Sequence, residues 1–381
     1  MANTVSIDQL RPELWQKKLF KNVMDDNFFS RFTGEGENNI VQSLSDLKKS
    51  RGDQVTVPLT AKLMGNGVVG DAEKEGNEES INAYYDTVAI DSWSTQVRLT
   101  GELDEQKNAY NMRDDAQNKL SVHLKEFIER QIFLKLGGVN NTTLTDVAGN
   151  IVGTRATWSN PPAQVPTADT GNGYGNRYLC ADYTSGADSL AATDLITPEL
   201  ISRAKYKAMQ KQANGLPKVN PLRIDGMEHY VMFIHPWQGF DLKNNATFAQ
   251  AQREAGVRGN SNRIFSGALG MWDGVILYEH EYVPFLDVSA AGYNFNSADA
   301  GTIFGGGTVD CFRALLCGQQ AAIMAQTNKS MKMVEKLFNY DSQVGYSTTF
   351  MGGIQKTTFT NGTTSLDYGV VAVDTSATSL V

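Results

Sequence analysis

Two stretches of alternating apolar and polar residues precede a long helical stretch in the first third of the chain. In the first stretch, Val55, Val57 and Leu59 fall on one parity of an extended backbone, and polar residues fall on the other. The return stretch, residues 84–99, alternates in the same way but changes parity near Asp91. Alternation with a period of two is typical of half-buried strands, and a change of parity indicates a bulge. The pattern predicts a long β-hairpin.

A polar segment joins the two strands and contains almost nothing apolar to pack. Its charged residues are five carboxylates and one lysine: Asp71, Glu73, Glu75, Glu78, Glu79 and Lys74. Its glycines are Gly65, Gly67, Gly70 and Gly76. Such a segment is either solvated or charge-paired with another molecule. Because an isolated two-stranded ribbon is only marginally stable in water, we expect something outside the hairpin to hold it. A hairpin that lies on its own domain is the alternative.

A long helix is expected next, because residues 102–136 are a nearly unbroken run of helix-forming residues. At 1.5 Å per residue the helix would span roughly 50 Å. Apolar residues recur at steps of three and four and predict a buried stripe of Ala116, Leu120, Leu124, Phe127, Ile128 and Ile132. The opposite face is expected to lie in water with Asp114, Lys125, Glu129 and Lys135. Gly137 and Gly138 predict the end of the helix.

The remainder of the chain mixes loop-rich and strand-like sequence. Residues 140–195 are rich in Asn, Thr, Gly and Pro, which predicts a surface insertion. Thr197 and Pro198 suit the N-cap and first turn of a second helix that ends at about Gln212. The other predicted elements are a buried strand at 228–234, helical turns within 236–254, strands at 275–282 and 309–316, and antiparallel strands from 331 to the end.

Composition and charge narrow the class of protein. A chain of 381 residues with 41% hydrophobic and 20% charged residues is typical of a soluble α+β protein with two or three domains. Neither a membrane-spanning run nor a signal-peptide layout is found, so we expect residence in the cytosol. The net charge of −8 is spread along the chain without a Lys/Arg cluster, which disfavours sequence-specific nucleic-acid binding. The three cysteines, Cys180, Cys311 and Cys317, have no CxxC spacing, so we expect buried reduced thiols.

The strongest chemical motif is a G-x-G-x-x-G sequence from Gly65 to Gly70. A dinucleotide site requires a helix after the third glycine, whereas the acidic sequence that follows here would repel phosphate. Pro58 also favours an edge strand over the central strand of such a fold. Glu279, His280 and Glu281 could bind a metal, but a solvated strand edge explains them better. We therefore expect no catalytic residues, cofactor or metal, and a dinucleotide-dependent enzyme stays as an alternative.

The order of these parts resembles the major capsid protein of tailed bacteriophages, with the Hong Kong 97-like fold. The amino-acid sequence at residues 51–59, 65–67 and 98–101 is similar to that of the N-four podovirus major capsid family. The resemblance implies an N-terminal arm, an extended β-hairpin loop, a long spine helix, and peripheral and axial domains. The implied divisions are 1–50 (arm), 51–101 (extended loop), 102–139 (spine helix), 140–195 (surface insertion), 196–330 (peripheral-to-axial domain) and 331–381 (C-terminal strands returning to the peripheral sheet).

The same resemblance implies a function and partners. The chain would assemble with itself, as hexamers and pentamers, into an icosahedral shell that encloses double-stranded DNA without sequence-specific binding and without a membrane. Assembly would occur in the host bacterial cytoplasm, with a scaffolding protein, a portal and a decoration protein as further partners. The residues expected at contacts between subunits are Gly65, Gly67, Gly70, Asp71, Glu73, Glu75, Glu78, Glu79, Tyr84, Tyr85 and Trp93. An encapsulin-like nanocompartment shell of the same fold is the alternative.

Overall fold

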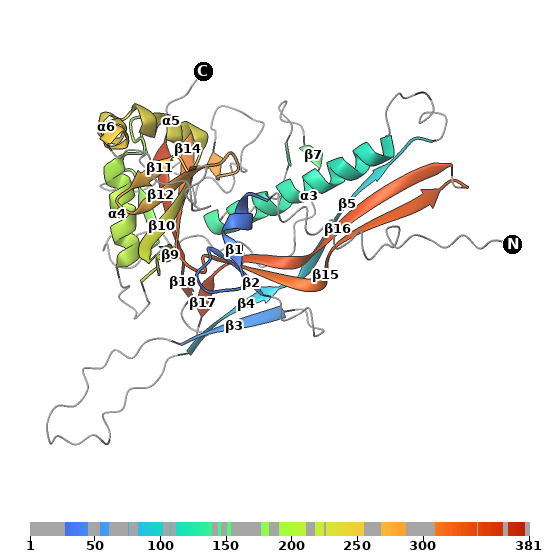
Figure 1. Ribbon diagram of the computed structural model, residues 1–381, viewed down its shortest axis with the longest axis horizontal. Coiled ribbons are helices and arrows are strands. Elements are labelled where there is room, and N and C mark those ends of the chain that lie inside the picture. The colour runs from blue at the N-terminus through green and yellow to red at the C-terminus, as the bar shows by residue number, and fades with distance from the viewer. Residues whose placement is uncertain are drawn as a thin grey trace.

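The computed structural model describes residues 27–44, 54–60, 75, 83–101, 107, 112–138, 144–145, 151–153, 177–182, 190–210, 218–224, 226–254, 268–286, 309–340, 342–360 and 365–377. The helices in these ranges are η2 (Phe28–Arg31), α3 (Met112–Gly137), α4 (Pro198–Met209), α5 (Pro236–Asn244) and α6 (Ala246–Glu254). Helices α4, α5 and α6 gather at one end of the molecule, whereas α3 extends along a second, elongated part (Figure 1). Within the described residues, no helix is both long and apolar enough to cross a bilayer.

An eight-stranded sheet forms the centre of the first part. Its strands are β8 (Tyr178–Cys180), β9 (Leu222–Ile224), β10 (Met227–Ile234), β11 (Gly270–Trp272), β12 (Val275–Glu279), β13 (Phe285–Leu286), β14 (Cys311–Cys317) and β19 (Val370–Ser376). The main order is β11-β12-β10-β14-β19-β8, with β9 paired to β10 and β13 paired to β14. The strands predicted at 228–234, 275–282 and 309–316 are confirmed as β10, β12 and β14.

The central strands of this sheet are buried on both faces. In β10, Val231 and Phe233 join the hydrophobic core that includes α3. Tyr230, Met232 and Ile234 point to the other face and join the core formed with α4, α5 and α6. A strand buried on both sides has a continuous apolar sequence, which explains why β10 is recognisable without structural information. The predicted start of α4 is also confirmed, because the Thr197 side chain accepts a hydrogen bond from the backbone of Leu200.

Helix α3 confirms the predicted stripe and end, but the predicted solvated face holds only in its first half, where Asp114 is exposed. All six stripe residues are buried, and Gly138 adopts a φ of +71° where the helix ends. Glu129 and Lys135, expected in water, are only 5% and 7% exposed. The second half of α3 is enclosed by other elements, and the backbone N–H of Phe28 donates to Glu129 at 2.6 Å. Burial raises the pKa of Glu129 and lowers that of Lys135.

A five-stranded sheet lies against α3 in the second part. Its order is β1 (Thr33–Gly34), β2 (Val41–Leu44), β15 (Ala322–Phe338), β16 (Gln343–Lys356) and β5 (Asp91–Arg98). The antiparallel strands predicted after Met331 are confirmed in β15 and β16. Residues 27–44, predicted to be part of an arm, belong to the core instead. Phe29 and Phe32 are at most 2% exposed, because their rings pack against Phe233 of β10.

The predicted hairpin is confirmed, but its base rests on its own subunit. Strands β3 (Gln54–Thr60) and β4 (Ala83–Ala89) pair antiparallel and join β17 (Thr358–Thr360) and β18 (Ser365–Asp367) in a four-stranded sheet. Val55 and Val88 pack against Ile323 and Ala325 of β15. The base of the hairpin therefore lies on its own domain, which was the alternative stated above. The apolar contacts come from residues more than 200 positions away in sequence, so the local pattern could not reveal them.

The change of parity near Asp91 marks a passage between two sheets. β4 ends at Ala89 in the four-stranded sheet, and β5 begins at Asp91 in the five-stranded sheet, with Ile90 between them. At this crossing Gly353 of β16 approaches the chain so closely that a Cβ there would lie 2.2 Å from the carbonyl oxygen of Ala89. Any larger residue at position 353 would push β16 away from the end of β4.

Two of the predicted divisions are wrong at their edges. The last strand, β19, does not return to the sheet beside α3 but lies between β14 and β8 in the eight-stranded sheet. All seven of its residues are buried, as a central strand requires. Residues 178–180, placed in a surface insertion, form β8 of the same sheet, and Arg177 before them is 1% exposed. The insertion also contains the short pair β6 (Leu144–Thr145) and β7 (Ile151–Gly153).

Candidate assembly surfaces

Most residues nominated from the sequence for contacts between subunits cannot be placed. Gly65, Gly67, Gly70, Asp71, Glu73, Glu78 and Glu79 lie outside the described residues. Glu75 is exposed. The three aromatic candidates are all described. Tyr84 is 9% exposed and Tyr85, its neighbour in β4, is 45% exposed. Trp93 stacks on Phe127 of α3 with ring centroids 3.8 Å apart, so its ring is engaged within its own subunit. Of the three, Tyr85 offers the most surface to a neighbour.

The outer half of the β15–β16 hairpin is a second candidate surface. β15 is 17 residues long, roughly 55 Å at about 3.3 Å per residue. Its inner residues, 322–326, are buried, whereas most of 332–337 are exposed. Figure 1 shows this end of the hairpin at the opposite end of the molecule from α4 and α6.

One face of this outer sheet packs on α3 and the other is open. Val97, Met333 and Tyr346 face the core that includes Leu120 of α3. Alternate residues face the other way, and the strand registers place them in three rows: Lys332, Thr349 and Ser94; Val334, Ser347 and Gln96; Lys336, Gly345 and Arg98. We call Arg98, Lys332 and Lys336 the basic face. All three are exposed, and no carboxylate among the described residues forms an ion pair with them.

The outer row of the basic face is ordered by an aromatic ring. The guanidinium carbon of Arg98 and the ammonium of Lys336 lie 4.6 and 5.0 Å from the centroid of the Phe338 ring. A cation over a ring face is attracted by the negative ring quadrupole. Gly345 makes room for the ring, because a Cβ there would lie 2.7 Å from it. Arg98 also donates a hydrogen bond to Gln343. Two like charges are thus held side by side.

The basic face is not a cluster along the sequence, because Arg98 is far from Lys332 and Lys336, and it was not predicted. Part of the face could have been predicted, because Lys332 and Lys336 lie an even number of residues apart in a strand-like stretch and therefore point to the same side. Only the pairing of β5 with β16 brings Arg98 to the same face.

The turn of the same hairpin exposes an aromatic ring. Asn339 and Tyr340 both have positive φ, +52° and +55°, and Tyr340 is fully exposed. Glycine usually occupies such positions, and a bulky residue there is strained. Leu337 next to the turn is 46% exposed. The tip therefore presents apolar surface together with the basic face.

The histidine and cysteine side chains considered above as chemical candidates pack inside the subunit. His280 packs against Phe28 and Phe133, and burial lowers its pKa to about 4. Glu279 pairs with Lys243 at 2.8 Å while both side chains stay part exposed, and Glu281 is exposed, but β12 lies between β11 and β10 and is not the edge strand that was expected. The three cysteines are buried and free, as predicted, and burial raises the pKa of Cys180 to about 12. Among the described residues, no group of His, Cys, Asp and Glu is arranged to hold a metal ion.

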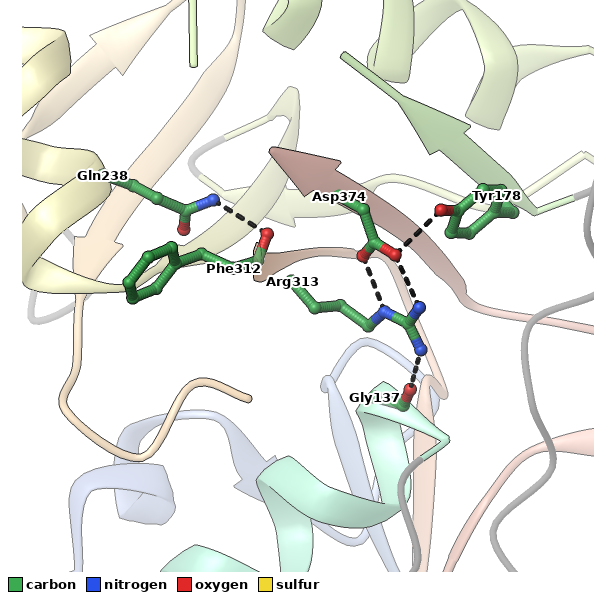
Figure 2. A network of polar contacts seen from close by, with 6 residues as sticks. All are labelled: Gly137, Tyr178, Gln238, Phe312, Arg313 and Asp374. Carbon is green, nitrogen blue, oxygen red and sulfur yellow. Dashed lines mark hydrogen bonds and ion pairs between the residues drawn. The ribbon is translucent and has the colours of Figure 1, made fainter. Parts of the chain in front are cut away.

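A buried ion pair lies within the eight-stranded sheet, and its arginine also bonds to the end of α3 (Figure 2). Nε and Nη2 of Arg313 in β14 donate to the two carboxylate oxygens of Asp374 in β19, at 2.7 and 2.6 Å. The Tyr178 hydroxyl donates to Asp374 at 2.8 Å, and Nη1 of Arg313 donates to the carbonyl oxygen of Gly137 at 3.0 Å. Burial alone would lower the pKa of Arg313, but the adjacent carboxylate raises it. A cation at the carboxyl end of α3 also suits the helix dipole.

Comparison with known proteins identifies the class to which this architecture belongs. A sequence model of phage capsid proteins matches residues 3–379. The chain belongs to the phage capsid protein family. It is 28% identical to the major capsid protein of Pseudomonas phage KPP25 over 387 residues, which cover 98% of this chain and 96% of that protein.

Solved phage capsids share the fold. The capsid of Ralstonia phage GP4 has a TM-score of 0.74 and 25% identity, with 100% of this chain and 95% of that chain covered. The capsid of cyanophage Pam1 has a TM-score of 0.68 and 21% identity, with 99% and 95% covered. The α+β, Hong Kong 97-like fold is confirmed, as is the function of a phage major capsid protein. These findings favour that function over a nanocompartment shell or a dinucleotide-dependent enzyme.

Proposed function

We propose that this capsid protein assembles as hexamers and pentamers into the icosahedral shell around the double-stranded DNA of a tailed phage, and that it has no catalytic activity. Assembly takes place in the host cytoplasm with a scaffolding protein and a portal, and a decoration protein binds the shell. Membership of the capsid family over residues 3–379 carries this proposal. The contacts that build the shell are the acidic segment 71–79, Tyr85 and the outer part of the β15–β16 hairpin.

Charge complementarity supports a specific pairing between the acidic segment of one copy and the basic face of another. Residues 71–79 carry five carboxylates and one lysine, so their net charge is −4 (1 − 5), whereas the basic face carries three cations. Exposed ion pairs contribute only about 0.2–1 kcal/mol each. Such weak contacts become decisive when they are repeated around a closed shell, because each further contact is formed within an assembly already held together.

The direction of the strands favours a contact between copies over one within a subunit. β4 runs directly into β5 along one line, and β5 ends beside the basic face (Figure 1). β3 is antiparallel to β4, so it runs away from that face before the chain enters residues 61–82. A neighbouring subunit is therefore the better partner for the acidic segment.

Charge reversal tests this pairing. Changing both Lys332→Glu and Lys336→Glu should leave a folded subunit, because both side chains are exposed, but should prevent shell formation when the protein is expressed with its scaffold. Adding Glu73→Lys and Glu75→Lys to the same chain should restore shells. The matched control is Lys119→Glu, which changes an exposed lysine (76%) of α3. Circular dichroism reports folding, and electron microscopy and gradient sedimentation report shells.

The outcomes separate the pairing from the assembly function. If the reversed protein forms shells at wild-type yield, the pairing is wrong although the capsid function stands. Deleting residues 64–83 should leave a soluble protein without shells, and normal shells from that variant would remove the hairpin from the assembly contacts altogether.

A further inference from the structure

Strand β5 forms one edge of the five-stranded sheet. Its neighbour among the described residues is β16, with which it pairs antiparallel from Asp91 to Arg98 (Figure 1). The pairing continues over all eight residues without a shift of register, so the strand is long and regular. An edge strand presents a row of backbone N–H and C=O groups that a further strand can bind. The free side of β5 is therefore a candidate surface for strand pairing.

The hydrogen bonds to β16 show which residues of β5 turn these groups outward. In the same register, the backbone N–H of Leu99 donates to the carbonyl oxygen of Val344 at 2.9 Å. Along an antiparallel strand the backbone groups of successive residues point alternately toward and away from the partner. Odd-numbered residues therefore bond to β16, and even-numbered residues point their N–H and C=O groups away from it. These are Ser92, Ser94, Gln96 and Arg98, and all four are exposed.

Most of these outward groups are unused. The N–H of Ser92 donates to the Asp91 carboxylate at 2.7 Å. Within the described ranges, the outward N–H groups of Ser94, Gln96 and Arg98 donate no hydrogen bond. Three consecutive positions of the edge are thus ready to bind a strand.

The other free edges in the described part of the chain are short or blocked. The strands β1, β6, β7, β8, β9, β11, β13 and β18 have two or three residues each. β3 has seven residues, but it contains Pro58, whose nitrogen has no hydrogen to donate. Proteins protect edges by shortness, proline, lysine or a bulge. β5 has none of these features, so its edge is the exception.

A second copy of this chain is the partner that fits the edge. The capsid function requires that many copies contact one another. A contact about a two-fold axis joins the same surface of both copies, and an axis normal to the sheet makes the two strands antiparallel. Because β5 is the one long, unprotected edge among the strands that the structure describes, the strand that matches it is β5 itself.

We propose that β5 pairs antiparallel with β5 of a second copy, so that the two five-stranded sheets form one continuous sheet across a contact between subunits. The proposal rests on the self-assembly proposed above, and it names a contact that differs from the charge pairing. The basic face projects from one side of the sheet, whereas the edge lies in the plane of the sheet. One subunit can therefore make both contacts at once.

The side chains under α3 favour a register centred on Thr95. In this register Thr95 lies opposite Thr95 of the second copy, and Trp93 lies opposite Val97 of the second copy. A pair of threonines and an aromatic residue opposite a β-branched one are favourable cross-strand pairs. Trp93 and Val97 are only partly buried where they pack at the margins of the cores that include α3. Pairing would cover more of their surface.

The opposite face of the sheet is compatible with the same register. Ser94 lies opposite Gln96 of the second copy, and their outward N–H and C=O groups exchange hydrogen bonds. Arg98 lies opposite Ser92 of the second copy. The two arginines are then six residues apart along the strands, roughly 20 Å at about 3.3 Å per residue, so they do not repel each other closely.

A proline at position 96 tests the edge. The N–H of Gln96 points away from β16, so Gln96→Pro keeps the bonds between β5 and β16, removes a donor from the edge and fills the edge with the ring. We expect a folded subunit that no longer forms shells when expressed with its scaffold. The matched control, Gln96→Ala, keeps the N–H and should form shells at wild-type yield. Circular dichroism reports folding, and electron microscopy reports shells.

Cysteine cross-linking tests the partner and the register. The Cα atoms of a non-hydrogen-bonded antiparallel pair are about 4.5 Å apart, which a disulfide can bridge. Thr95→Cys should therefore give disulfide-linked dimers under mild oxidation, both in shells and in concentrated subunits. The matched control Ser94→Cys should give none, because the two copies of residue 94 would lie beyond the roughly 7 Å limit. The native cysteines are buried and do not compete.

The remaining outcomes decide against the proposal. Shells of Gln96→Pro at wild-type yield, or no dimers of Thr95→Cys, would overturn the strand pairing. Dimers of Ser94→Cys would refute the register, and a loss of shells in Gln96→Ala would assign the effect to the side chain. If Gln96→Pro does not fold, the cross-links decide alone. If the wild-type chain forms no shells, the assembly function fails, whereas cross-linking of free subunits still decides the pairing.

Discussion

Replacing Asp374 by asparagine should test how much the buried ion pair between β14 and β19 contributes to the stability of the subunit. Asparagine keeps the shape of the side chain but removes its charge and replaces one acceptor oxygen by a donor. Arg313, 1% exposed, would keep its bond to Gly137 but lose one of its two charged acceptor contacts. Since the guanidinium stays charged and cannot reach water, its desolvation is no longer compensated.

The expected loss is large. A charge-assisted hydrogen bond contributes about 1.5–3 kcal/mol, and removing one partner of a buried pair typically costs about 3–5 kcal/mol. We expect the free energy of unfolding to fall by about 3–5 kcal/mol in Asp374→Asn. The matched control is Asp115→Asn, which breaks the exposed pair with Lys119 and should cost at most about 0.5 kcal/mol.

Urea unfolding of unassembled subunits, followed by circular dichroism, gives the free energy of unfolding of both variants from the midpoint and slope of each transition. A loss below about 1 kcal/mol for Asp374→Asn would refute the reasoning, because it would mean that Arg313 finds water or another acceptor. The double variant Arg313→Met with Asp374→Leu provides a second check. It leaves no buried charge, so it should be more stable than Asp374→Asn alone.

Two further substitutions test the core by the same urea measurement. Phe133→Ala should lower the free energy of unfolding by about 3–5 kcal/mol, because Phe133 is fully buried between the rings of Phe29 and Phe233; a loss near zero would mean that the aromatic cluster is not packed as described. Gly369→Ala should cost about 1–3 kcal/mol, because φ is +79° and a Cβ would lie 2.5 Å from Cα of Ala321. An unchanged midpoint would contradict that close approach.

Local patterns along the chain predicted the individual elements well. The stripe of α3 follows from spacing at three and four residues, and the end of α3 follows from Gly137 and Gly138. β10 follows from an unbroken apolar run, and the start of α4 follows from Thr197. In each case the physical cause acts between residues close in sequence, so the sequence alone carries the information.

Contacts between distant segments limited the prediction of the surfaces. The sequence did not show that the ring of Trp93, a predicted contact residue, stacks on Phe127 of α3. The basic face was missed because β5 and β15 meet only through β16. Glu129 was predicted to lie in water because its partner, the backbone N–H of Phe28, is 101 residues away in sequence.

The sequence by itself determined the long helix α3, the start of α4, the main strands β10, β12 and β14 and, through the family resemblance, the capsid function. Tertiary structure alone decided which sheet each strand joins: β19 pairs with β14, and the base of the hairpin packs on β15. The physical reason is that the period of a strand specifies which residues share a face, whereas the choice of neighbour depends on burial and hydrogen bonds contributed by segments hundreds of residues away.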